Sequence, residues 1–90
     1  MHRKKRTHLQ IVSDILEKCI KPQNKTSIMY QSNLSYTMMT SYLLELQQAK
    51  LLEVSFYSEK EYAITARGRE YLEKYRALQK IVDLSAPDDF

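Results

Sequence analysis

The feature that most limits the fold of this chain is the spacing of its apolar residues, which changes twice along the sequence. From residue 7 to residue 49, apolar side chains recur every three or four positions, which is the spacing of amphipathic helices. Between Leu52 and Ile64 they alternate with polar residues, as in a strand that is buried on one face. Helical spacing returns from Ala66 to about Leu84. The sequence therefore predicts helices, then a β-hairpin, then a final helix.

Three helices are predicted before the hairpin, at residues 7–20, 26–32 and 36–49. Thr7 and Ser35 suit the N-caps of the first and third helices, and Asn24 or Thr26 suits the second, because their side-chain oxygens accept hydrogen bonds from helix N–H groups. Asn33 tolerates the left-handed conformation of a tight turn between helices. The expected core residues are Leu9, Val12, Leu16, Cys19, Ile28, Met29, Leu34, Met39, Leu43 and Leu46, with Ile11, Ile15, Ile20 and Tyr42 widening the apolar faces.

The hairpin is expected to turn at residues 58–60, and Thr65 is a suitable N-cap for the helix that follows it. Two helices joined by a tight turn form a helix-turn-helix, and a hairpin placed after them forms a wing. The predicted fold is mainly α with a small β-hairpin, a winged helix-turn-helix (α-α-α-β-β-α) with an extended C-terminal helix. The first strand is predicted from Leu52, Val54 and Phe56, which alternate with polar residues, and Tyr62 and Ile64 form the return strand.

Positive charge is concentrated near the amino end of the chain. The net charge is +5 over residues 1–25 and −2 over the remainder. Such a basic block is typical of an interaction tail that contacts nucleic acid, and a solvated tail that aids solubility is the alternative. No apolar stretch follows the block, so a secretory signal and a membrane span are not expected. With a single cysteine, which excludes an internal disulfide, this favours a cytoplasmic protein.

Catalysis is not expected from this sequence. One glycine in the chain excludes a glycine-rich phosphate loop. His2 and His8 have no partners at metal-ligand spacing, and Cys19 is expected to be a small buried apolar residue. No cofactor, metal or small-molecule substrate is therefore predicted.

Three blocks of the sequence carry a resemblance to a known family. They are TSIMYQSNLSY at residues 26–36, YLLEL at 42–46 with two leucines at 51–52, and YAITARGREYL at 62–72. The chain resembles the small archaeal winged-helix DNA-binding proteins, which include ten-kilodalton nucleoid proteins and predicted transcription regulators. The resemblance implies a winged-helix fold, DNA binding and dimerisation through the last helix. The chain departs from it at Lys50, where glycine is usual, in an acidic wing tip at 58–61, and in a short last helix.

The third helix is the candidate recognition helix, because the second helix of a helix-turn-helix enters the major groove. Thr37 and Thr40 could donate hydrogen bonds to bases or touch thymine methyl groups. A polar face that only contacts solvent is the alternative. Arg67 and Arg69 could reach DNA or pair with nearby glutamates. The residues predicted to contact DNA are Arg3, Lys4, Lys5, Arg6, Lys25, Thr26, Ser35, Tyr36, Thr37, Met38, Thr40, Ser41 and Lys60.

The last helix carries apolar residues at spacings of three and four, as in a coiled-coil seam. This spacing predicts a homodimer interface, although one wide stripe against a monomer core is the alternative. The predicted interface residues are Tyr71, Tyr75, Leu78, Ile81 and Val82.

The sequence thus divides into a flexible basic arm at 1–6, a winged-helix domain at 7–65, a C-terminal helix at 66–84 and an acidic tail at 85–90. The predicted function is that of a homodimeric transcription regulator that binds double-stranded DNA. The alternatives are an architectural chromatin protein without sequence preference and a winged-helix adaptor that binds proteins.

Overall fold

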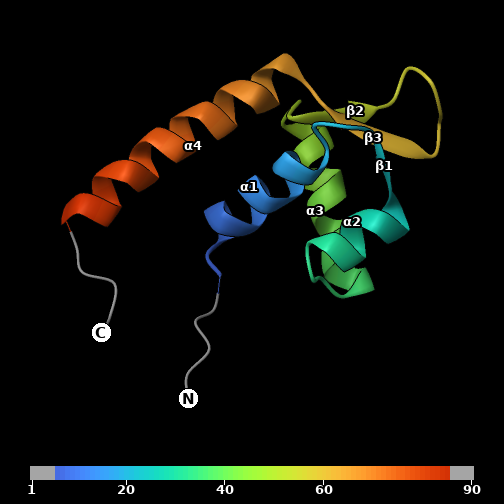
Figure 1. The fold of residues 1–90 in the computed structure, drawn as a ribbon. Coiled ribbons are helices and arrows are strands. Elements are labelled where there is room, and N and C mark those ends of the chain that lie inside the picture. Colours follow the sequence, from blue (N-terminus) through green and yellow to red (C-terminus); the bar gives the residue numbers. More distant parts are fainter. Residues whose placement is uncertain (1–5, 86–90) are drawn as a thin grey trace.

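The computed structural model describes the backbone of residues 6–85 and the side chains of residues 6–82. The elements are α1 (His8–Lys18), β1 (Gln23–Asn24), α2 (Lys25–Gln31), α3 (Tyr36–Gln48), β2 (Leu52–Val54), β3 (Glu61–Ile64) and α4 (Ala66–Ser85). Figure 1 shows α1, α2 and α3 gathered beside the small sheet, while α4 runs away from the sheet past α1. This order confirms the predicted fold class, with a long C-terminal helix after the hairpin.

The first three helices begin at side-chain caps. Thr7 forms a capping box with Gln10: the Thr7 hydroxyl accepts from the Gln10 N–H at 3.1 Å, and the Gln10 amide oxygen accepts from the Thr7 N–H at 2.7 Å. Asn24 caps α2 by accepting from Ser27 N–H at 2.8 Å, and Ser35 caps α3 by accepting from Met38 N–H at 3.1 Å. These bonds satisfy N–H groups that have no partner inside the helix. The caps predicted at Thr7 and Ser35 are confirmed, and Asn24 rather than Thr26 caps the second helix.

One hydrophobic core holds the helices and the sheet together. Residues from α1, α2 and α3 are its most deeply buried members, namely Ile15, Leu16, Cys19, Ile28, Met39 and Leu46. The predictions for Leu9 and Ile20 are wrong, since 48% of Leu9 and 39% of Ile20 are exposed. Leu9 lies at the edge of the buried face of α1, whose most deeply buried residues are Ile15 and Leu16, and Ile20 follows the C-cap Cys19, beyond the end of the helix.

The sheet has three antiparallel strands in the order β1-β3-β2, not the two of the predicted hairpin. Leu52 pairs with Ile64 and Val54 with Tyr62, and β1 joins the other edge of β3 through Gln23. The prediction that the first strand reaches Phe56 is also wrong. β2 ends at Val54, which is 44% exposed, and beyond it Ser55 is buried and Phe56 is 94% exposed.

The chain leaves α3 through a left-handed residue and enters α4 through a shared hydrogen-bond network. Lys50 has φ 66°, a conformation that favours glycine. Its carbonyl accepts from the Thr65 hydroxyl at 2.7 Å, and the same hydroxyl accepts from the Gly68 N–H at 2.9 Å. We call Lys50, Leu51, Thr65 and Gly68 the α3–α4 junction. It fixes the start of α4 against the end of α3.

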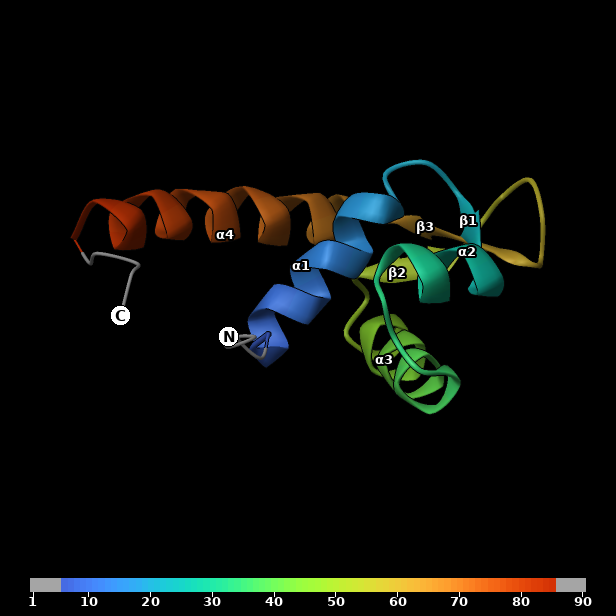
Figure 2. The same ribbon diagram turned by 60° about the horizontal axis from the view of Figure 1, so that its bottom comes forward.

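The contacts of α4 with the rest of the domain are concentrated between Ala66 and Arg76. Leu72 is 4% exposed, and Arg76 pairs with Glu17 of α1 at 3.2 Å. Figure 2 shows the remainder of α4 extending past α1, at the end of the molecule opposite the wing. The radius of gyration is 14.0 Å, against about 12 Å for a compact domain of this length. The helix therefore projects from the domain.

Candidate nucleic-acid interface

α3 has one buried face and one exposed face. Met39, Leu43 and Leu46 enter the core, as the sequence predicts. Because α3 follows α2 through the tight turn at Asn33, whose φ is 55°, it is the second helix of a helix-turn-helix. The exposed residues of α3 are Tyr36, Thr37, Met38, Thr40, Ser41 and Leu44 in its amino-terminal part, followed by Glu45 and Gln48.

The exposed face of α3 is uncharged over its first two turns. α3 contains no lysine or arginine, and its one acidic residue, Glu45, lies in the second half of the helix. Thr40 donates its hydroxyl hydrogen to the carbonyl of Tyr36 at 2.9 Å, one turn earlier in α3. Any attraction between this region and phosphate therefore comes from neighbouring elements and from the unpaired N–H groups at the start of the helix.

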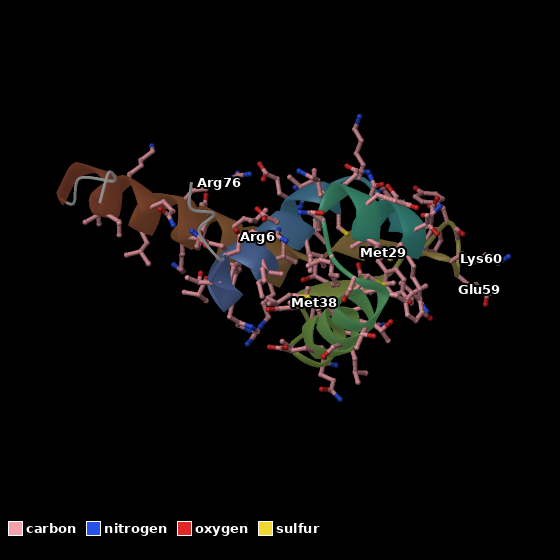
Figure 3. All side chains as sticks on the ribbon, turned by 90° about the horizontal axis from the view of Figure 1, so that it is seen from below. Arg6, Met29, Met38, Glu59, Lys60 and Arg76 are labelled. Carbon is pink, nitrogen blue, oxygen red and sulfur yellow. The ribbon has the colours of Figure 1, made fainter. Side chains whose placement is uncertain are left out.

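The structure brings together two sets of predicted DNA contacts that lie far apart in the sequence. Lys25 and Thr26, at the start of α2, line a shallow hollow of about 410 Å³ with Lys60 of the wing. Glu59 lines the same hollow, so its charge is mixed. Figure 3 shows Glu59 and Lys60 projecting from the end of the wing, away from the helices.

The tip of the wing is the loop of residues 55–60 between β2 and β3, and two serines of this loop hold its backbone. The Ser55 hydroxyl accepts from the Tyr57 N–H at 3.1 Å, and the Ser58 hydroxyl accepts from the Lys60 N–H at 3.2 Å. Between them Phe56 and Tyr57 are 94% and 85% exposed, with their rings edge to face at 5.3 Å. The sequence analysis missed this exposed pair, because it placed Phe56 in a strand.

Arg6 is held by its own domain. Its guanidinium pairs with Asp14 of α1 at 2.7 Å and donates to the carbonyl of Asn33 at 3.1 Å. Figure 3 shows it beside α1. The other predicted arm residues, Arg3, Lys4 and Lys5, lie outside the described part of the chain, as does most of the predicted tail at 85–90.

The residues predicted for the dimer interface fall into two groups. Tyr71 and Tyr75 are half-buried within their own domain, with their rings stacked at 6.5 Å. Burial, and then the neighbouring Tyr75, raise the pKa of Tyr71 above its usual value. Leu78, Ile81 and Val82 are 50%, 63% and 44% exposed. The second group extends beyond the monomer core.

The sequence analysis also missed a polar link between α1 and α3. His8 contacts Glu45 at 2.9 Å through Nε2 and the Tyr42 hydroxyl at 3.1 Å through Nδ1, and its ring stacks on Tyr42. These residues are at least 34 positions apart in sequence, so local spacing gives no signal for the link. It braces the first helix against the candidate recognition helix.

Neither a metal site nor a reactive thiol is evident in the described residues. Across residues 6–82, no group of three or more His, Cys, Asp and Glu side chains is placed to hold a metal ion. Burial raises the pKa of the Cys19 thiol from 9.0 to about 12, so the thiolate is not populated near neutral pH. No helix in the described part of the chain has the length and hydropathy to cross a bilayer.

Comparison with known proteins places the fold. Sso10a-2, a DNA-binding protein from Sulfolobus solfataricus, is 23% identical with a TM-score of 0.67, covering 92% of this chain and 100% of that one. RV1404 from Mycobacterium tuberculosis is 18% identical with a TM-score of 0.60, covering 92% of this chain and 63% of that one. ZitR from Lactococcus lactis is 13% identical with a TM-score of 0.61, covering 99% and 69%.

Among curated proteins, none is significantly similar to this chain. A family model described as winged helix-turn-helix matches residues 5–83, which include the helix-turn-helix, the wing and most of α4. With the element order, the caps and the junction described above, this match shows that the chain belongs to the winged helix-turn-helix family.

Proposed function

We propose that this protein binds double-stranded DNA through α3 and regulates transcription as a two-fold homodimer. The observation that carries the proposal is the exposed face of α3. As the second helix of a helix-turn-helix, α3 presents side chains from its first two turns to solvent while its opposite face is anchored in the core. Helices in this position enter the major groove of DNA in many proteins of this architecture.

The surrounding charges support contact with the DNA backbone. Lys25 and Lys60 share one hollow beside α2, and Arg3, Lys4 and Lys5 precede the domain. Lysine and arginine side chains that neutralise phosphates supply most of the sequence-independent affinity of DNA-binding proteins. The similarity to Sso10a-2, a DNA-binding protein, agrees with this assignment.

The projecting half of α4 supports the homodimer. Leu78 and Ile81 leave apolar surface on a helix that its own domain does not cover. A two-fold interface buries the same residues from both copies, which makes pairing of two α4 helices an efficient way to cover them. Two recognition helices then belong to one dimer, as in dimeric regulators that bind paired half-sites.

A salt titration tests DNA binding directly. Affinity for a labelled random duplex of about 20 base pairs is measured by fluorescence anisotropy between about 50 and 200 mM salt, where each neutralised phosphate contributes about 0.9 to the log–log slope. Lys25→Gln and Lys60→Gln should each flatten the slope by about that amount. Lys74→Gln, which removes the same charge from α4, is the matched control. Equal effects of all three variants would mean that net charge, rather than a site, governs binding.

The amino-terminal arm is tested in the same assay. Removal of residues 1–5 deletes Arg3, Lys4 and Lys5 but keeps Arg6, which is engaged with Asp14. The slope should fall by about 3 units if all three cations contact phosphates. An unchanged slope would show that the arm does not take part. Competition between a selected duplex and random DNA then separates a regulator from an architectural protein, because only the regulator prefers the selected sequence.

A protein-interaction adaptor is the second candidate function, and the wing favours it. Phe56 and Tyr57 expose two aromatic rings beside Glu59, and aromatic residues are enriched at protein interfaces. An acidic wing also repels phosphate. Absence of binding to any duplex at low salt would support the adaptor over the regulator.

A further inference from the structure

The exposed face of α3 lacks the side chains that recognise purines in the major groove. Guanine is recognised mainly by arginine or lysine, and adenine by asparagine or glutamine. None of these four residue types occurs in the first two turns of α3, and Gln47 and Gln48 lie in its last turn. The amino-terminal residues of a recognition helix contact the base edges. At these positions α3 therefore has no side chain that can form two hydrogen bonds to one purine.

Thr40 presents a methyl group rather than a hydroxyl donor. Its hydroxyl hydrogen is given to the Tyr36 carbonyl at 2.9 Å, so it is not available to a base. The side chain is exposed, and what remains for contact is the γ-methyl group and a weakly directional acceptor.

Large side chains with apolar surface lie near Thr40 on the exposed face of α3. Met38 is 41% exposed, Leu44 is 59% exposed and Tyr36 is 64% exposed. Thr37 adds a second exposed γ-methyl group, one turn before Thr40. The apolar group that B-DNA presents in its major groove is the C5-methyl of thymine. The exposed methyl and apolar groups of α3 are complementary to that group, and the polar groups beside them are only the single hydroxyls of Tyr36, Thr37 and Ser41.

We propose that α3 selects DNA by contact with thymine C5-methyl groups, with the methyl groups of Thr40 and Thr37 as the principal contacts. This inference rests on the DNA-binding function proposed above and adds the chemical group by which sites are chosen. Duplexes rich in A·T pairs are then the preferred ligands, because they present more thymine methyl groups in the major groove.

Thymine and uracil duplexes isolate the methyl group. An alternating A·T duplex and the same duplex with uracil in place of thymine have the same Watson–Crick pairing and minor-groove groups, and differ only at C5. The full-length protein should bind the uracil duplex more weakly, by about fourfold for each contacted methyl, the factor expected from the transfer of one buried CH₂ group. In the reverse arm, 5-methylcytosine in an alternating G·C duplex should raise affinity over cytosine.

Two variants at Thr40 assign the effect to the protein side. Thr40→Val keeps a methyl group and removes the hydroxyl, and should retain the preference for thymine over uracil. Thr40→Ser keeps the hydroxyl and removes the methyl group, and should reduce that preference by about fourfold. Both changes are on the exposed face of α3, and circular dichroism verifies that each variant is folded. Comparing the two duplexes within each variant isolates the pairwise contact.

The outcomes separate this inference from the function on which it rests. Equal affinity for the thymine and uracil duplexes would overturn methyl contact while leaving DNA binding intact. Loss of preference in Thr40→Val but not in Thr40→Ser would assign selection to the hydroxyl and overturn the inference in the same way. Absence of binding to all four duplexes at low salt would overturn both proposals.

Discussion

Gly68 is a point of close contact between α4 and the rest of the domain. It is the only glycine in the chain, and a Cβ atom at this position would collide with the Leu51 carbonyl and lie 2.6 Å from Cγ1 of Ile64. The backbone of Leu51 cannot retreat easily, because its carbonyl also accepts from the Thr65 N–H at 3.1 Å. The missing side chain therefore has a packing role at the junction, not a conformational one.

Gly68→Ala should destabilise the protein, although alanine favours helix by about 1 kcal/mol over glycine. Overpacking at this contact is expected to lower the free energy of unfolding by about 1–3 kcal/mol in urea denaturation followed by circular dichroism. Glu73→Ala, at an exposed position of the same helix, is the control and should change it by less than about 0.5 kcal/mol. A more stable Gly68→Ala protein would contradict the close contact.

Cys19 gives the protein a specific response to alkaline pH. The thiol has a pKa of 9.0 when exposed, and burial raises the pKa to about 12 in the folded chain. Between these values the unfolded chain loses the proton and the folded chain keeps it, so the free energy of unfolding falls as pH rises from 9 to 12. The expected slope from this group is about 1.4 kcal/mol per pH unit, and no contribution is expected below pH 9.

Urea denaturation of the wild type and of Cys19→Ala across this pH range measures the effect. The variant should be less stable at neutral pH, because alanine leaves space in the core, but its stability should depend less steeply on alkaline pH. Parallel pH profiles for the two proteins would show that the Cys19 thiol ionises equally well in the folded chain.

Among the elements, the wing carries aromatic side chains that contribute little to folding. Its backbone is organised by Ser55 and Ser58, whereas Phe56 and Tyr57 point into solvent. Exposed aromatic side chains with no core contact add little to stability but are typical of interaction sites.

Replacing both Phe56 and Tyr57 with serine should change the free energy of unfolding by less than about 0.5 kcal/mol, since neither ring is buried. Thermal unfolding by circular dichroism provides the measurement. Leu52→Ala, in the buried part of β2, is the contrast and should cost about 2–5 kcal/mol. A large loss in the double variant would mean that the rings pack against the domain in solution.

The elements that could be predicted from the sequence are those with their own spacing and caps. α3 begins after Ser35 and buries Met39, Leu43 and Leu46 because that spacing repeats over three turns. β1 could not be predicted, since it has only two residues and exists because Gln23 and Asn24 meet β3. The sequence places Phe56 in the first strand, because alternation carries no information about where a strand ends.

The candidate site, like the fold, could be predicted only where local sequence determines it. The position of α3 and the residues of its exposed face follow from the helix-turn-helix order and the helical spacing. The hollow shared by Lys25 and Lys60, the Arg6–Asp14 pair and the link from His8 to Glu45 depend on contacts between distant segments. The spacing of residues along the chain does not show which distant segments meet, so these contacts are known only from the folded structure.

At the scale of the whole molecule, α4 is the element that extends furthest from the core. The domain measures 43 × 29 × 19 Å along its principal axes, and Figure 2 shows the projecting part of α4 along the longest dimension. Isolated helices of this length are marginal in water, so a projecting helix needs packing on one face to persist. A second copy of the chain supplies that packing in the proposed dimer.

Leu78→Glu with Ile81→Lys should convert the protein to a monomer while the domain stays folded, because both side chains lie outside the core. Light scattering at micromolar concentration should then change from twice the chain mass to one chain of 10.7 kDa. Lys74→Gln, an exposed substitution on the same helix, should leave the mass unchanged. A wild-type protein that already has the mass of one chain would contradict the dimer.

The α3–α4 junction has a consequence for which DNA sequences suit such a dimer. The Thr65 hydroxyl bonds to both Lys50 and Gly68, so the angle between α3 and α4 is set within one chain. Two recognition helices joined through paired α4 helices then stand at a fixed separation, with no flexible linker to adjust it. Half-sites moved apart by half a helical turn, about 17 Å of duplex, would face opposite sides of the DNA. In the proposed dimer, Thr65 and Gly68, which lie outside α3, therefore limit the spacing of half-sites that both recognition helices can occupy at once.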